Sequence, residues 1–157
     1  MHRRGAAIAT RRLEAARTIA RTPTEVFDWV ADYHNVHRVM DGVSEWRPVG
    51  RQAEGVGAHY LVELGRLPVP LRARLVIVEW KRPEAIGWAT EASPVSNGGR
   101  WSFRSAPAGT RVGLAVSYQP PAGAVGNFLA ARVEGIVRNR ITAALDRMKE
   151  ELEAPGD

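Results

Sequence analysis

The sequence predicts an α+β protein with an antiparallel sheet at its centre and one long helix at its end. Between residues 43 and 119, apolar and polar residues alternate, with turn signals about every 8–12 residues, as in an antiparallel meander. After Pro120-Pro121 the apolar residues recur at helical spacing instead. Before the sheet, Thr22-Pro23-Thr24-Glu25 has the pattern of a helix N-terminus. The predicted order is strand, two short helices, sheet and long helix.

The first elements are predicted from local patterns. Residues 13–20 mix apolar and polar positions and are predicted as a strand. Thr22 is a suitable N-cap and Glu25 completes a capping box, so a short helix should begin there and end near Tyr33. A second helical turn is predicted over residues 35–40, where a following Asp-Gly pair stops it.

The central region is predicted to be a meander of strands. In residues 56–64 the apolar side chains Val56, Ala58, Tyr60, Val62 and Leu64 fall on one face, whereas His59 falls on the other. Further strands are predicted over residues 71–80, 86–92, 100–104 and 112–118. Asn97-Gly98-Gly99 and Pro107-Ala108-Gly109 are predicted as turns between them.

One helix is predicted over residues 122–153, where a broad apolar stripe is matched by a charged opposite face. A helix of that length spans about 48 Å, enough to cross a small sheet. Gly135 lies in its middle, where glycine costs about 1 kcal/mol relative to alanine. Two interpretations of Gly135 stay open: a close approach of the helix to the sheet, or room for a ligand.

Composition and charge exclude several classes of protein. The chain has 157 residues, 45% hydrophobic and 25% charged, which is typical of one globular domain. It has no cysteine, so disulfides and thiolate chemistry are excluded. It also lacks an apolar stretch long enough for a transmembrane segment. We expect a cytoplasmic protein that is a monomer or a homodimer.

The positive charge is concentrated at the N-terminus. The formal net charge is +5, but Arg3, Arg4, Arg11 and Arg12 account for four of the 22 basic residues, which leaves 18 against 17 acidic ones. We therefore predict a flexible basic leader over residues 1–12, a single domain over 13–153 and a tail over 154–157. A nearly neutral body argues against a nucleic acid as the partner.

These patterns together resemble a known superfamily. Its members open with a strand, a Pro-led helix and a short second helix before a Gly-Val strand, here residues 13–20, 22–32, 34–40 and Asp41-Gly42-Val43. The later Glu79-Trp80-Lys81-Arg82-Pro83 with Trp88 resembles the strand–Pro–strand turn of the same group. The group is the START, polyketide cyclase/dehydrase and birch-pollen-allergen superfamily (SRPBCC). Val39 stands where many relatives carry Trp, so no substrate assignment is transferred.

The resemblance implies a helix-grip fold, in which a curved antiparallel sheet wraps around the C-terminal helix and a cavity lies between them. Physical reasoning supports such a cavity, because a curved sheet and a straight helix cannot stay in contact along their full length. The implied ligand is a small hydrophobic molecule, such as a lipid, a quinone or a polyketide-like compound.

Catalytic and metal motifs are weak. His34 and His37 lie one helical turn apart, but no carboxylate cluster supplies a third ligand, so no metal site is predicted. A nucleophile elbow and a nucleotide-binding glycine motif are both absent. No cofactor is predicted. The candidates for acid–base chemistry are Tyr60, Tyr118, Arg132 and His37, and none is assigned as catalytic.

The predicted ligand site follows from strand and helix phase. Aromatic residues that share the inward face with Tyr60 should line the cavity, and the first half of the helix should close its mouth. Arg132 would be the cation for an acidic or enolic ligand oxygen. The predicted lining residues are Tyr60, Trp88, Trp101, Phe103, Tyr118, Phe128, Arg132 and Ile136. Two functions stay open: non-catalytic binding of a hydrophobic molecule, or a polyketide aromatase/cyclase that uses the same cavity.

Overall fold

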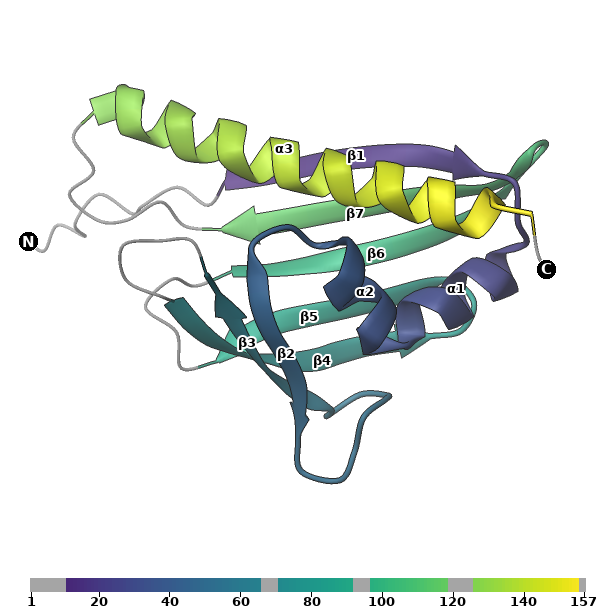
Figure 1. Ribbon diagram of the computed structural model, residues 1–157, viewed down its shortest axis with the longest axis horizontal. Coiled ribbons are helices and arrows are strands. Elements are labelled where there is room, and N and C mark those ends of the chain that lie inside the picture. The colour runs from purple at the N-terminus through teal and green to yellow at the C-terminus, as the bar shows by residue number, and fades with distance from the viewer. Residues whose placement is uncertain (1–10, 66–70, 92–96, 119–125, 156–157) are drawn as a thin grey trace, which may run out of the picture.

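The computed structural model describes residues 11–65, 71–91, 97–118 and 126–155. Seven strands and three helices follow one another in these segments (Figure 1). The elements are β1 (Arg11–Ile19), α1 (Pro23–Ala31), α2 (Tyr33–Val39), β2 (Val43–Val49), β3 (His59–Leu64), β4 (Leu71–Lys81), β5 (Ala85–Glu91), β6 (Asn97–Ala106), β7 (Gly109–Tyr118) and α3 (Gly126–Glu153).

The strands form one antiparallel sheet in the order β1-β7-β6-β5-β4-β3-β2. All three helices lie on the same face of this sheet, with α3 running along β1 (Figure 1). This arrangement confirms the predicted α+β fold and the helix-grip architecture. The face that carries the helices is the concave face, and the opposite one is called the convex face below.

The two short helices are set by their capping residues. Thr22 Oγ1 accepts a hydrogen bond from the Glu25 amide at 3.2 Å, and the Glu25 carboxylate accepts one from the Thr22 amide at 3.1 Å. This is the predicted capping box. Asp32 ends α1 and also caps α2, because its carboxylate accepts a hydrogen bond from the His34 amide at 3.0 Å. As a result, α2 begins at Tyr33, two residues before the predicted start.

Two strand boundaries differ from the predictions. β1 begins at Arg11, because Arg11 and Arg12 pair with β7. β3 begins at His59 rather than at residue 56, and Val56 is 60% exposed. Gly55 and Gly57 have φ angles of 87° and 93°, which interrupt the extended backbone before the strand. Apolar alternation therefore extends beyond the strand at this point.

The turn predicted at Asn97-Gly98-Gly99 is wrong, because all three residues belong to β6. Gly99 pairs with Trp88 of β5, and a Cβ at Gly99 would collide with the Trp88 ring. The glycine is therefore required so that the indole can lie across the neighbouring strand. By contrast, the turn predicted over residues 107–109 is present: Ala106 pairs with Gly109 across a two-residue connection.

The long helix is confirmed as one continuous element from Gly126 to Glu153, and residues 122–125 of the predicted range lie outside the described residues. Its C-terminal half is buried through Ile141, Leu145 and Met148. Gly135 is not needed for close packing, since a Cβ there would have no atom within 4 Å. None of the described helices is apolar enough over a sufficient length to cross a membrane.

Candidate ligand-binding cavity

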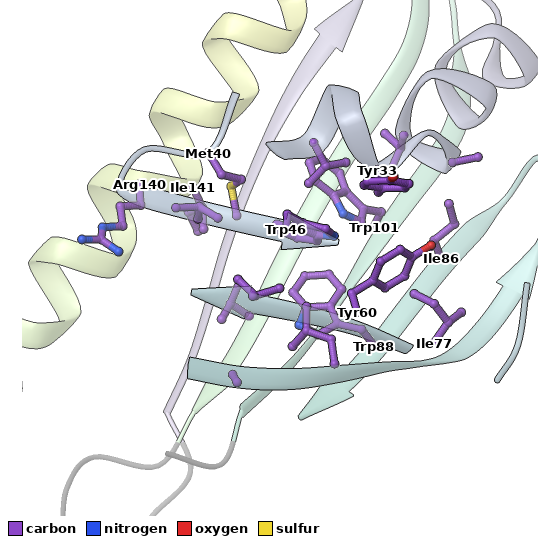
Figure 2. Close-up of a pocket in the computed structure, with 18 of the residues that line it drawn as sticks. Tyr33, Met40, Trp46, Tyr60, Ile77, Ile86, Trp88, Trp101, Arg140 and Ile141 are labelled. Atoms are coloured by element: carbon purple, nitrogen blue, oxygen red, sulfur yellow. The ribbon is translucent and has the colours of Figure 1, made fainter. Parts of the chain in front are cut away.

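The concave face holds a cavity of about 240 Å³ between the sheet, α2 and α3 (Figure 2). Most of the side chains around it are aliphatic or aromatic. The aromatic ones are Tyr33, Trp46, Tyr60, Trp80, Trp88 and Trp101. An apolar cavity with aromatic walls is the usual form of a small-molecule site in proteins.

Strand register explains the sheet wall of the cavity. Successive side chains of a strand point to opposite faces, so every second residue reaches the same side. Tyr60 of β3 lies opposite Leu75 of β4, and Val62 opposite Ala73. Further along the sheet, Trp101 of β6 lies opposite Ile86 of β5. All six side chains line the cavity.

The helices supply the opposite wall. Tyr33 and Val36 of α2 line the cavity, with Met40 just after that helix, and Val137, Arg140 and Ile141 of α3 do so from the far side. The Tyr33 and Tyr60 rings lie 5.6 Å apart between centroids, so α2 and β3 meet through aromatic contact. The Trp46 ring of β2 lies 6.3 Å from Tyr60. These three rings form one aromatic cluster (Figure 2).

Tyr33 and Tyr60 both bring a hydroxyl to this cluster, and Tyr60 is the more deeply buried of the two. Its hydroxyl donates a hydrogen bond to the Ala53 carbonyl. Burial, with a smaller contribution from Glu54, raises the pKa of Tyr60 to about 12. The phenol is therefore neutral at pH 7 and its proton is already engaged, which disfavours a role as a general base.

The Trp46 ring, next to Tyr60 in the aromatic cluster, has a buried polar atom without a partner among the described residues. Trp46 Nε1 is buried and has no hydrogen-bond partner. An unpaired N–H of this kind is costly, about 1–3 kcal/mol. Among the described residues that line the cavity there is no Asp, Glu, His or Lys. The cavity can therefore stack and enclose an apolar molecule, but it does not present an acid–base pair.

Arg140 is the cationic side chain at this cavity. It lies at the edge formed by α3, and its guanidinium points away from the aromatic cluster (Figure 2). The guanidinium lies against Gly42, where a Cβ would be 3.2 Å from one of its nitrogens. Gly42 also has a φ of 79°, so the turn after α2 favours glycine for two reasons.

The structure brings together three of the residues predicted for the site: Tyr60, Trp88 and Trp101 all line the cavity. Phe103 instead packs beneath α1, with its ring 5.8 Å from that of Phe27. Tyr118 is only 5% exposed but is not part of the cavity lining.

The residues predicted from the helix lie elsewhere. Arg132 is exposed and Ile136 is 50% exposed, so neither faces the cavity. The side chain of Phe128 lies outside the described residues. The reason for the difference is the position of contact along α3: among its described side chains, those that face the cavity begin at Val137.

Sequence reasoning missed Tyr33, noted Arg140 beside the apolar stripe without including it in the predicted lining, and left Trp46 unplaced. The sequence predicts Tyr33 at the end of α1, whereas Asp32 caps a second helix that turns Tyr33 toward the cavity. Asp32 itself could have indicated the start of this second helix, because Asp is a favoured N-cap residue. Arg140 borders the apolar stripe of α3, but nothing in the sequence shows which half of a long helix faces a cavity.

The three described histidines, His34, His37 and His59, each have a separate polar partner. His34 Nδ1 pairs with Asp32 at 2.8 Å, and His37 Nε2 lies 3.1 Å from the Val43 carbonyl. Within the described residues, no three His, Cys, Asp or Glu side chains come together as a metal site would require. His59 faces away from the cavity and pairs with Glu91 at 3.3 Å.

Comparison with known proteins assigns the chain to a family. The model of the family described as polyketide cyclase / dehydrase and lipid transport matches residues 10–153. No curated protein sequence matches the chain.

Solved structures share the fold at low sequence identity. TTHA0849 from Thermus thermophilus is 19% identical with a TM-score of 0.80, covering 94% of this chain and 100% of that one. The Zhui aromatase/cyclase from Streptomyces sp. R1128 is 18% identical with a TM-score of 0.74, over 92% and 94%. Ara h 8.0201 is 10% identical with a TM-score of 0.64, over 89% and 98%.

Proposed function

Because the chain belongs to the polyketide cyclase / dehydrase and lipid transport family, we propose that it binds a small, flat, largely apolar molecule in the cavity of the concave face. The observation that carries the proposal is the lining itself: six aromatic side chains surround a cavity of about 240 Å³. Sites for drug-sized ligands hold roughly 300–1,000 Å³. A ligand of one or two fused rings therefore suits this cavity better than a long-chain lipid.

Aromatic side chains favour a flat ligand. Aromatic rings attract one another in offset or edge-to-face geometry, beyond the gain from burying their area. Trp46, Tyr60 and Trp88 reach the cavity from three different strands, so they offer rings at different angles around one space. A planar quinone or a polyketide-like aromatic compound can contact several of them at once.

The polar groups favour binding over catalysis. An aldol cyclisation and dehydration needs a group that accepts a proton within hydrogen-bond reach of the substrate. The described lining has no carboxylate or imidazole, and the Tyr60 phenol is neutral at pH 7 and donates to Ala53. Carriage or storage of the molecule requires none of these groups.

A second candidate function is a polyketide aromatase/cyclase. The Zhui structure carries that name, and a hydroxyl and a guanidinium do occur at the cavity here, on Tyr60 and Arg140. If this function holds, Tyr60 is the residue expected to touch the substrate. Loss of product formation in Tyr60→Phe, with binding retained, would then distinguish a cyclase from a binding protein.

Binding is tested with 1-naphthol, whose fused rings suit the cavity and whose addition should quench the fluorescence of the nearby Trp residues. Ala73→Phe fills the cavity from β4 and should weaken 1-naphthol binding tenfold or more. The matched control is Ala89→Phe, because Ala89 lies on the neighbouring strand β5 and is not part of the cavity lining. The control should change the dissociation constant less than twofold.

Two results would contradict the proposal. The first is an equal loss of binding in both variants, which would place 1-naphthol outside the cavity. The second is cyclisation of a linear poly-β-ketone thioester by the wild-type protein, measured as new aromatic absorbance and lost in Tyr60→Phe. The second result would establish the aromatase/cyclase instead.

A further inference from the structure

No described helix covers the convex face (Figure 1). This face has a groove over β1, β7 and β6. The groove measures about 530 Å³ and is separated from the cavity by the sheet. Its floor is made of small residues, and Ser102 and Gly113 lie opposite each other at its centre. A Cβ at Gly113 would lie 2.6 Å from the Ser102 hydroxyl oxygen. Any larger residue at 113 would therefore displace this hydroxyl and fill the floor.

One end of the groove brings two positive charges together. Arg104 of β6 and Arg111 of β7 are direct cross-strand partners, and both side chains are exposed. Like charges that face each other directly across two strands repel and destabilise the sheet. In the described part of the chain, neither guanidinium has a hydrogen-bond or ion-pair partner. The pair is thus an arrangement that an anion would stabilise.

The other end of the groove is already neutralised. Arg100 makes two hydrogen bonds to the Glu79 carboxylate, at 2.7 and 3.2 Å. Arg12 pairs with Glu14 at 2.8 Å. Arg100 and Arg104 are four residues apart on one strand, or about 13 Å. At one end of the groove, therefore, the arginines make no ion pair with any described residue. About 13 Å away, at the other end, two carboxylates would repel a second anionic group.

We propose that this groove binds a small molecule with a single phosphate group, held between Arg104 and Arg111, and with an uncharged body over Ser102 and Gly113. Guanidinium groups donate pairs of parallel hydrogen bonds to phosphate oxygens, so two facing arginines suit one tetrahedral anion. The uneven charge along the groove disfavours a polymer with many phosphates, because two of the four described arginines of the groove are already paired with carboxylates. The site is on the opposite face from the cavity and does not depend on the proposed function.

The test uses glycerol 3-phosphate as the probe, since it has no aromatic ring to enter the cavity. Backbone amide NMR spectra of the full chain are recorded during titration. We expect saturable shifts at the amides of Ser102 and Gly113, and no such shifts with glycerol. Arg104→Gln and Arg111→Gln should each raise the dissociation constant about tenfold or more, because each removes charge-assisted hydrogen bonds.

Arg74→Gln is the matched control, because Arg74 is exposed on β4 outside the groove and also has no partner in the described residues. It should change the dissociation constant less than twofold. Ala73→Phe should leave phosphate binding intact, which separates this test from that of the cavity. The proposal is overturned if Arg74→Gln weakens binding as much as Arg111→Gln. It is also overturned if a 12-nucleotide single-stranded DNA binds more tightly than glycerol 3-phosphate with the same arginine dependence.

Discussion

The two ends of the concave face are built from similar residues, yet one is filled and the other is hollow. At the filled end, the Phe27 ring of α1 meets Phe103 at 5.8 Å edge-to-face, and it meets Trp80, which also borders the cavity, at 5.4 Å in the same geometry. At the hollow end, Tyr33 and Trp46 contact Tyr60 at 5.6 and 6.3 Å in tilted geometry. Aromatic composition alone therefore does not distinguish a core from a binding cavity.

The difference arises from how closely the helices approach the sheet. The C-terminal half of α3 is held against β1 by Arg17–Asp146 at 2.7 Å and by Lys149, which donates to the Thr18 carbonyl at 2.6 Å. Met148 and Leu145 are fully buried there. Toward its N-terminus the same helix has exposed side chains, such as Ile136. A straight helix over a twisted sheet can pack tightly over only part of its length.

The largest expected effect is at the filled end. Phe27→Ala should reduce the free energy of unfolding by about 3–5 kcal/mol, because it removes a fully buried ring from a packed core. Tyr33→Ala, at the hollow end, should cost less than about 2 kcal/mol, since its ring already borders empty space. Urea denaturation measures both. Equal losses would mean that the two ends are packed alike.

Two substitutions of alanine by phenylalanine test the same comparison, with smaller expected changes in stability. Ala144→Phe introduces a ring where α3 is fully buried and should destabilise the protein by about 1–3 kcal/mol or more. Ala73→Phe introduces the same ring into the cavity and should change stability by less than about 1 kcal/mol. The measurement is again the free energy of unfolding. If Ala73→Phe is the more damaging variant, the cavity does not exist in solution as described.

The smallest effect is confined to high pH. Burial raises the pKa of Tyr60 to about 12, above the ordinary value of 10.0, so the folded state retains this proton longer than the unfolded chain. Its contribution to stability is complete below pH 10 and is lost as the pH rises from 10 to 12. Tyr60→Phe should therefore show a flatter decline of stability over that range. Parallel curves for the two proteins would show that the phenol is solvated.

Local signals in the sequence predicted the elements well where neighbouring residues decide the outcome. Thr22 and Glu25 lie three residues apart and form a capping box by themselves, so the start of α1 needs no tertiary information. The change from alternating to helical spacing likewise identified α3 and the antiparallel sheet. The family resemblance, and with it the helix-grip fold, rested on these same elements.

Signals failed where a distant residue decides the outcome. Gly98 and Gly99 have the composition of a turn, but they lie within β6 because the Trp88 ring occupies the space a side chain would need. Arg132 and Arg140 both border the apolar stripe of α3, and only the approach of α3 to the sheet places Arg140 at the cavity. Phe103 was predicted to line the cavity, but the position of α1 over the sheet makes it pack beneath that helix instead.

The sequence by itself determined the order of elements, the inward face of the strand that carries Tyr60 and Val62, and the family, because these depend on residue spacing and caps along the chain. Only the tertiary structure decided where the concave face is filled and where it is hollow, because that depends on the angle between a straight helix and a twisted sheet. The pairing of Arg104 with Arg111 was likewise decided by strand register, which brings together two residues seven positions apart across the hairpin of β6 and β7.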